Sequence, residues 1–278
     1  MGRTARVVVV DRDALLELLP PCATTGIGSL PLSLDEALQL SMQQDVPYLP
    51  ELAGEALVDG FSEGPTFRAF IAELTKHRPK FAKVQLAGPA TLAAQGPGPV
   101  LQRLPDTVRS LVGRVAQTGA APIIFFDEPA LHESEAPVRA LDFVRRAARD
   151  AGALVGLHCC GQARWEQLLA LGFDFISLDA RLSLDALLED RRAWVRFLER
   201  GGRLCLGIIP TNRGARYDVN ELCASVEASL RATTSHFERV LSRTLLSPAC
   251  GLATHSPEDA RRITSEVRLA QEGLRSVL

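Results

Sequence analysis

Residues 153–179 read ALVGLHCCGQARWEQLLALGFDFISLD. A short apolar run ends in His158-Cys159-Cys160, a helical segment follows, and a second apolar run ends in Asp179. Each run is too short for a helix and is followed by polar or metal-binding residues, which is typical of a buried strand. The stretch therefore predicts a strand, a helix and a second, parallel strand, the unit from which parallel sheets are built.

The same unit repeats along the chain. Eight apolar runs are predicted strands, at 22–27, 46–49, 82–86, 122–126, 153–157, 174–178, 203–208 and 244–246. Amphipathic segments separate several of them, the clearest at 138–151, 184–199, 219–233 and 257–274. Eight units of about 35 residues predict an α/β fold, a single (β/α)8 TIM barrel that spans residues 1–278 as one domain. Residues 1–20 are a predicted N-terminal extension, a strand and a helix that close the bottom of the barrel.

A doubly wound open sheet is the main alternative fold. Such a sheet carries Gly-x-Gly-x-x-Gly after its first strand when it binds a dinucleotide. No such motif follows the first predicted strand of this chain. We therefore favour the barrel.

The composition excludes several classes of protein. Hydrophobic residues make up 46% of the 278 residues and charged residues 23%, so the chain can bury a large core and is not disordered. The 31 basic and 33 acidic residues give a formal net charge of -2, which does not favour nucleic acid or a membrane surface as a partner. No apolar run matches a membrane span or a signal peptide, so we expect a cytoplasmic protein with reduced cysteines.

Residues that can bind a metal follow several of the predicted strands. In a TIM barrel the C-terminal strand ends meet on one face and build the active site. His158 and Cys160 would lie on the same side of an extended segment, Asp179 ends the next strand, and Cys250 follows the last one. Imidazole, thiolate and carboxylate together suit Zn²⁺. The sequence therefore predicts one zinc ion per chain, bound by His158, Cys160, Asp179 and Cys250.

The predicted donor set favours one class of reaction. Two thiolates, a neutral imidazole and a carboxylate give the zinc site a net negative charge, which makes it a poor generator of hydroxide from water. A thiol that binds zinc is still deprotonated, and electron-rich ligands keep its sulfur nucleophilic. The donor set therefore favours alkylation of a thiol over hydrolysis.

Six motifs occur in the order of a known family. They are TTGIGSLP at 24–31, LAGPAT at 86–91, FDEPAL at 126–131, HCC at 158–160, ISLD at 176–179 and SPACGL at 247–252. With them the chain resembles the catalytic C-terminal domain of cobalamin-independent methionine synthase, in the superfamily shared with uroporphyrinogen decarboxylase and the coenzyme M methyltransferases. The resemblance implies methyl transfer to homocysteine, with His158, Cys160 and Cys250 as zinc ligands and Asp179 where the family has a glutamate.

The resemblance also implies which residues hold the amino acid end of the substrate. The backbone N–H groups of Ile27-Gly28-Ser29 would bind its carboxylate, since small residues let the main chain approach an anion closely. Asp127 is expected to pair with the ammonium group, with Glu51 as a second acid. Asp127 and Glu128 of the DEPAL motif are the predicted catalytic residues.

Three departures from the family bear on the methyl donor. The full family enzyme has two barrels, and this chain has length for one. The family follows its Gly-Pro-x-Thr motif with a tryptophan that stacks on folate, and it has a histidine after the seventh strand. Neither residue is present at the matching positions of this chain. We therefore expect a methylcorrinoid, free or on a protein, to supply the methyl group in place of methyltetrahydrofolate.

Three alternative functions remain open. The acceptor could be another small thiol, such as a coenzyme M-like sulfonate, although a thiol without an amine offers nothing to Asp127. Porphyrinogen decarboxylation is disfavoured because the N-terminal region has no arginine cluster to bind several carboxylates. A non-catalytic barrel that binds zinc or a corrinoid would hold zinc without methyl transfer.

Overall fold

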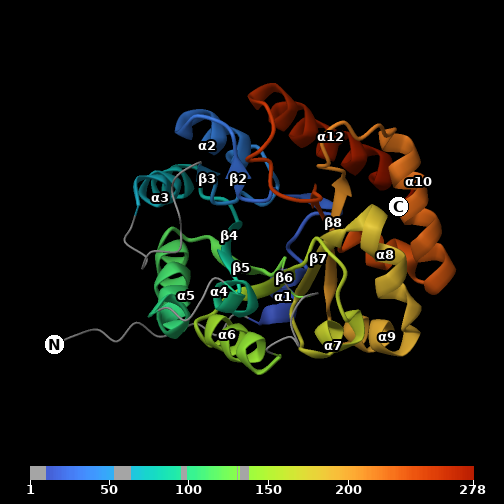
Figure 1. Ribbon diagram of the computed structural model, residues 1–278, viewed down its shortest axis with the longest axis horizontal. Helices are drawn as coiled ribbons and strands as arrows, with labels where there is room; N and C mark the ends of the chain where they lie inside the picture. The colour runs from blue at the N-terminus through green and yellow to red at the C-terminus, as the bar shows by residue number, and fades with distance from the viewer. Residues whose placement is uncertain (1–10, 53–63, 95–98, 130, 132–137) are drawn as a thin grey trace.

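A curled sheet of parallel strands forms the centre of the computed structural model, which describes residues 11–52, 64–94, 99–129, 131 and 138–278 (Figure 1). Seven strands lie in the order β1-β9-β8-β7-β6-β5-β4. Their bounds are Ala23–Thr24 (β1), Phe81–Ala87 (β4), Ala121–Asp127 (β5), Leu154–His158 (β6), Phe175–Asp179 (β7), Arg203–Ile209 (β8) and Leu245–Pro248 (β9). A separate parallel pair joins β2, Ser29–Leu30, to β3, Glu51–Leu52.

Segment 46–49 closes the sheet into a barrel. The Val46 N–H donates to the Thr24 carbonyl at 2.9 Å, on the β1 side. On the β4 side, the Lys83 N–H donates to the Pro47 carbonyl at 2.7 Å. The segment therefore occupies the place of the second predicted strand, and the (β/α)8 fold is confirmed.

Helices surround the strands (Figure 1). Their bounds are Arg12–Leu16 (α1), Leu34–Met42 (α2), Pro65–His77 (α3), Pro89–Ala94 (α4), Pro99–Gln117 (α5), Val138–Asp150 (α6), Trp165–Ala170 (α7), Ala180–Glu189 (α8), Arg191–Glu199 (α9), Val219–Thr233 (α10), Phe237–Ser242 (α11) and Pro257–Arg275 (α12). Among the described helices, none is both long and apolar enough to cross a membrane.

The local sequence explains where these helices begin. α12 starts after Ser256, whose hydroxyl accepts the Asp259 N–H at 3.0 Å. The single helix predicted over 184–199 is wrong: α8 ends at Glu189 and α9 begins at Arg191. Asp190 breaks the pattern because its own backbone is not helical and its side chain accepts two N–H groups of α9. A capping residue inside an apolar pattern therefore divided it into two helices.

The described part of the N-terminal extension, residues 11–20, covers the bottom of the barrel, as predicted. Leu16 and Leu19 are buried against the first residues of the strands, including Phe81 and Leu154. The fully buried Asp174 carboxylate accepts hydrogen bonds from Arg149 and from the α1 residue Arg12. The strand predicted within residues 1–20 lies largely outside the described residues.

Candidate metal and substrate site

Three of the four predicted metal ligands lie together at the C-terminal end of the barrel. His158 is the last residue of β6, Cys160 lies two residues further on, and Cys250 lies two residues after the end of β9. One ligand atom from each lies within 4.8 Å of the other two. Tetrahedral ligands of one zinc ion lie about 3.3–3.8 Å apart, given zinc–ligand bonds of about 2.0–2.3 Å. The spacing of this metal trio, His158, Cys160 and Cys250, therefore suits a single small ion.

The His158 ring is oriented for a metal. Its Nδ1 lies 2.8 Å from the Ser177 hydroxyl on the neighbouring strand β7. Its Nε2 is buried and has no hydrogen-bond partner. A neutral imidazole that donates from Nδ1 keeps a lone pair on Nε2, and metal-binding histidines are commonly oriented in this way. The unpartnered nitrogen is the atom that a metal would bind.

The two thiols of the trio influence each other strongly. The hydrogen bond from the Cys160 thiol, and then the nearby His158 ring, lower the pKa of Cys250 to about 4. The same contact with Cys250, together with burial, raises the pKa of Cys160. The pair therefore shares one proton readily, and a thiolate faces the imidazole. Thiolates and neutral imidazole are the donors that zinc prefers.

The fourth predicted ligand, Asp179, lies outside this trio. It ends β7 as expected, but its Oδ1 accepts the N–H groups of Arg181 at 2.9 Å and Leu182 at 3.1 Å. Burial raises its pKa, and the charge of Cys250 adds to the effect. The short aspartate side chain caps the first turn of α8, its own following helix. Helix capping thus explains why this carboxylate does not reach the trio.

The predicted carboxylate-binding turn lies beside the metal trio. The Leu252 N–H donates to the Ser29 carbonyl at 2.8 Å, which ties the turn to the loop that carries Cys250. On its other side, the Glu51 N–H donates to the Gly28 carbonyl at 2.7 Å. A Cβ carbon at Gly28 would meet the Glu51 side chain at 3.1 Å. The fold therefore brings the turn at 27–29, Glu51 and Cys250 together from distant parts of the sequence.

Asp127 ends β5 directly opposite His158 in the strand register. Its Oδ2 accepts a hydrogen bond from Gln85 Nε2 at 2.8 Å, while its Oδ1 is buried without a partner. Burial raises the pKa of Asp127. Burial, and then the charge of Asp127, raise the pKa of Glu51 to about 7. Burial therefore disfavours ionisation of both acids, and a bound cation would favour their charged forms.

Glu128 has a structural environment that differs from that of Asp127. Its buried carboxylate accepts the N–H groups of Ala90 at 2.8 Å and Thr91 at 2.7 Å, and also the Thr91 hydroxyl. A Cβ carbon at Gly88 would overlap this carboxylate, so only glycine fits there. The predicted catalytic residue Glu128 therefore holds the loop between β4 and α4, and its oxygens are occupied by that loop.

Two site residues were missed by the sequence analysis, Lys83 and Gln85. Both lie on β4 and are buried, and Lys83 Nζ donates to the Gly26 carbonyl at 2.7 Å. The signal was available, since two polar residues at alternate positions of an apolar strand face the same side. Apolar side chains dominate that run, and so its overall pattern predicts an ordinary buried strand.

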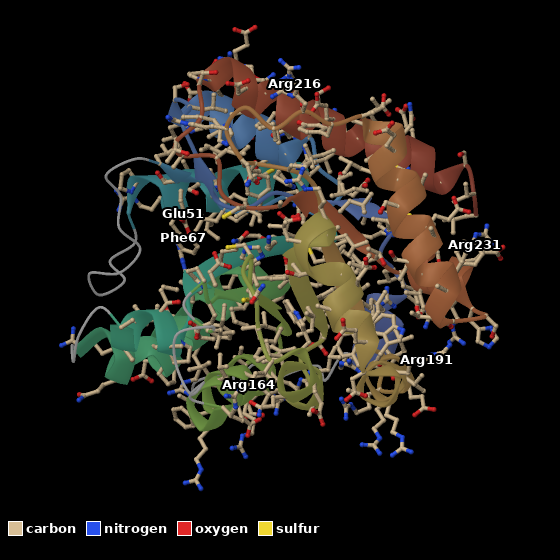
Figure 2. The ribbon with its side chains drawn as sticks, turned by 45° about the vertical axis from the view of Figure 1, so that its right-hand side comes forward. Glu51, Phe67, Arg164, Arg191, Arg216 and Arg231 are labelled. Carbon is tan, nitrogen blue, oxygen red and sulfur yellow. The ribbon has the colours of Figure 1, made fainter. Side chains whose placement is uncertain are left out.

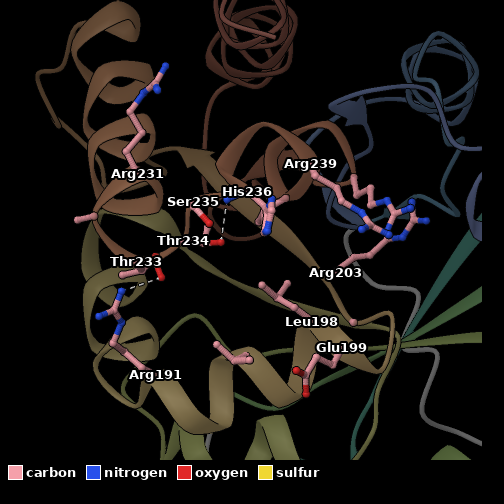
Figure 3. Close-up of a pocket in the computed structure, with 15 residues that line it drawn as sticks. Arg191, Leu198, Glu199, Arg203, Arg231, Thr233, Thr234, Ser235, His236 and Arg239 are labelled. Atoms are coloured by element: carbon pink, nitrogen blue, oxygen red, sulfur yellow. Dashed lines mark hydrogen bonds between the residues drawn. The ribbon is translucent and has the colours of Figure 1, made fainter.

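A separate pocket lies at the other end of the molecule. It has a volume of about 830 Å³ and is formed by α9, α10, α11 and the start of β8 (Figure 3). Arg191, Arg203 and Arg231 are among its lining residues, and no residue of the metal trio lines it. Figure 2 shows Arg191 and Arg231 well separated from Glu51. The pocket is therefore not part of the candidate site.

Comparison with known proteins shows the fold. No protein-family model matches the chain, and no curated protein does. Among solved structures it is similar to a D-psicose 3-epimerase from Clostridium cellulolyticum H10, with 11% identity over 91% of this chain and 99% of that chain and a TM-score of 0.51. It is also similar to xylanase 10B from Thermotoga maritima, with 12% identity, 94% and 100% coverage and a TM-score of 0.51. Identities this low support the barrel and do not bear on the reaction.

Proposed function

We propose that this protein is a zinc-dependent methyltransferase that moves a methyl group from a methylcorrinoid to the thiol of homocysteine and so forms methionine. One observation carries the proposal. The metal trio lies at the same end of the barrel as two features suited to an amino acid, the turn at 27–29 and Asp127. A thiol-binding metal and an amino acid site side by side suit a substrate that has both groups.

The residues of the trio fit zinc. They offer two sulfur atoms and one imidazole nitrogen, and that nitrogen is buried without a partner. Bound there, zinc would favour ionisation of the substrate thiol, and its thiolate ligands would keep the substrate sulfur nucleophilic. With Asp179 engaged by α8, we propose His158, Cys160 and Cys250 as the protein ligands.

The turn at 27–29 supports binding of the substrate carboxylate. Within the described residues, the N–H groups of Ile27 and Gly28 make no hydrogen bond. Lys83 holds the carbonyl of the preceding residue, Gly26, which fixes the start of the turn. Free backbone N–H groups in a fixed turn are a common means of anion binding. Asp127 would accept the substrate ammonium group at the neighbouring strand end.

The proposed reaction is a simple group transfer. The sulfur–methyl bond forms as the donor–methyl bond breaks, the donor keeps the electron pair of that bond, and the thiol proton is released. Both tryptophans are buried in helices, Trp165 in α7 and Trp194 in α9, where Trp194 stacks on Phe197. Neither is available as a platform for the pterin ring of a folate, which favours the corrinoid as donor.

A two-donor assay tests the proposal. Zinc-loaded protein is incubated with homocysteine and either methylcobalamin or methyltetrahydrofolate, and methionine is measured by mass spectrometry. We expect methionine with methylcobalamin alone. Methionine from methyltetrahydrofolate would refute the assignment of the donor. If one zinc ion is bound per chain and neither arm forms methionine, the proposed methyl transfer to homocysteine is refuted.

A pair of cysteine variants controls the assay. Cys250→Ser should lose zinc and activity together, because it removes a proposed ligand. Cys223→Ser changes a buried thiol whose hydrogen bond goes to the Ala270 carbonyl of α12, away from the metal trio, and should keep both. Equal zinc content in the two variants would contradict the proposed ligand set.

A further inference from the structure

Two buried oxygen atoms on neighbouring strands have no hydrogen-bond donor. They are Gln85 Oε1 on β4 and Asp127 Oδ1 on β5. The two side chains are joined by one hydrogen bond, from Gln85 Nε2 to Asp127 Oδ2 at 2.8 Å. Buried acceptors are usually paired, so an unpaired couple at a candidate site calls for an explanation.

The orientation of the Gln85 amide follows from its partner. A carboxylate accepts hydrogen bonds, so the amide nitrogen must face Asp127 and the amide oxygen must point away from that bond. Gln85 is only 2% exposed, so bulk water does not serve its oxygen. The pair therefore presents one carboxylate oxygen and one amide oxygen, and neither of them has a hydrogen-bond donor.

The nearest buried cation does not supply that donor. Lys83 Nζ bonds the Gly26 carbonyl at 2.7 Å and lies 4.5 Å from the centre of the Phe125 ring. No hydrogen bond joins Lys83 to Gln85 or Asp127 in the described part of the chain. Glu51 brings a further carboxyl group to this region, and no hydrogen bond joins it to Gln85 or Asp127 in the described part of the chain. A small cation with several N–H groups could donate to both oxygens at once.

We propose that Gln85 is a specificity-determining residue that forms, with Asp127, a subsite for a primary ammonium group. The Gln85 amide nitrogen orients Asp127, and its oxygen accepts a second hydrogen bond from the ligand. The substrate class is then an α-amino thiol, and thiols that lack the amine are disfavoured. The identity of that ligand as an amino acid thiol rests on the proposed function.

The rest of β4 fits this role. Lys83 and Gln85 alternate on the strand and both point inward, and each holds one part of the proposed amino acid site. Lys83 fixes the turn expected to bind the carboxylate, and Gln85 fixes the acid expected to bind the ammonium group. One strand thereby sets the distance between the two binding groups.

Two pairs of ligands and a matched variant test the proposal. Binding of homocysteine and 4-mercaptobutanoate to the zinc-loaded protein is measured by calorimetry, and the affinity ratio reports recognition of the amine. We expect wild-type protein to prefer homocysteine by about tenfold or more, and Gln85→Leu to lower that ratio about tenfold. Gln85→Met, closer in shape to glutamine, replaces the leucine variant if the latter does not fold.

Gln44→Leu is the matched control. Gln44 is also buried, its Oε1 also has no partner, and its Nε2 donates only to the Leu40 carbonyl at 3.2 Å. The control variant should keep the wild-type ratio. A ratio that falls equally in Gln85→Leu and Gln44→Leu would overturn the proposal.

The second pair, methionine and 4-(methylthio)butanoate, contains no thiol. Its affinity ratio therefore reports ammonium recognition independently of thiol binding and methyl transfer. A Gln85-dependent ratio without methyl transfer would refute the proposed reaction and support the subsite. Absence of a preference for the amine in both pairs, or a preference that survives Gln85→Leu, would overturn the subsite itself.

Discussion

Gly251 packs directly on Ser29: a Cβ carbon at position 251 would overlap the Ser29 hydroxyl. Gly251 follows Cys250, one of the metal trio, and Ser29 belongs to the turn at 27–29. The loops that follow the first and last strands of the barrel therefore meet so closely that a methyl group at position 251 requires the Ser29 hydroxyl to move. This contact joins the loop of the metal trio to the proposed carboxylate-binding turn.

The contact predicts the effect of Gly251→Ala. The added methyl must turn the Ser29 hydroxyl aside or shift the loop that carries Cys250, and small misplacements of binding groups lower catalysis strongly. We expect kcat/KM for homocysteine to fall about tenfold or more in steady-state assays. Gly113→Ala in α5 is the control, because a Cβ carbon there meets nothing within 4 Å and alanine favours a helix. Equal activity of the two variants would show that the contact is unimportant.

The Ser177 hydroxyl predicts a change in metal affinity. It fixes the His158 ring from β7, and removal of such an outer contact commonly costs about 10–100-fold in metal affinity. Ser177→Ala should therefore bind zinc at least about tenfold more weakly in competition with a chelator. Thr264→Val removes a buried hydroxyl that bonds only the Ala260 carbonyl of α12, and should bind zinc normally.

Glu128 and Asp127 are adjacent in sequence and should respond differently to loss of charge. Glu128→Gln places an amide against N–H donors of Ala90 and Thr91, so we expect a loss of about 1–3 kcal/mol in the free energy of unfolding. Asp127→Asn should mainly raise the KM for homocysteine. Urea denaturation and steady-state kinetics of both variants separate the two effects. A kcat lost in Glu128→Gln at unchanged stability would support the prediction that Glu128 is a catalytic residue.

The raised pKa of Glu51 predicts a dependence of stability on pH. In the folded protein, burial and then the charge of Asp127 raise the pKa of Glu51 to about 7, from its ordinary value of 4.5. Between these values the folded state binds more protons than the unfolded state, so stability falls as the pH rises from about 4.5 to 7. With allowance for solvent screening, we expect Glu51→Gln to remove on the order of 2 kcal/mol of this fall.

Chemical denaturation at a series of pH values measures this effect. The free energy of unfolding of wild-type protein and of Glu51→Gln is compared in the same zinc-loaded state. The two curves should converge near pH 4.5 and separate toward pH 7. Parallel curves would mean that Glu51 does not titrate in this range.

Most elements of the fold could be predicted from local patterns in the sequence. The helix predicted at 219–233 has those bounds in the structure, and the helix predicted at 257–274 ends one residue later. The spacing of the apolar residues and the capping residues at the helix ends determine such elements locally. The break at Asp190 was missed because a cap and an exposed helix position use the same residue type.

The candidate site was predictable only in part. His158, Cys160 and Cys250 could be grouped because the barrel brings strand ends together, whatever the details of packing. Whether Asp179 reaches the same point depends on a competition between a ligand position and a helix cap, which the sequence alone does not decide. The pairing of Gln85 with Asp127 depends on the register of β4 and β5, which is a property of the assembled sheet.

The barrel closes through short pieces of chain, a two-residue β1 and the single bridge between Tyr48 and Lys83. Little free energy is needed to open a short strand pairing, so backbone amides here should exchange with solvent faster than those of β5. The turn at 27–29 follows one side of this junction and Glu51 follows the other. An amino acid bound to both sides would hold the junction closed. Its binding should slow amide exchange at Thr25 and Leu49 far more than binding of a thiol that contacts the metal trio alone.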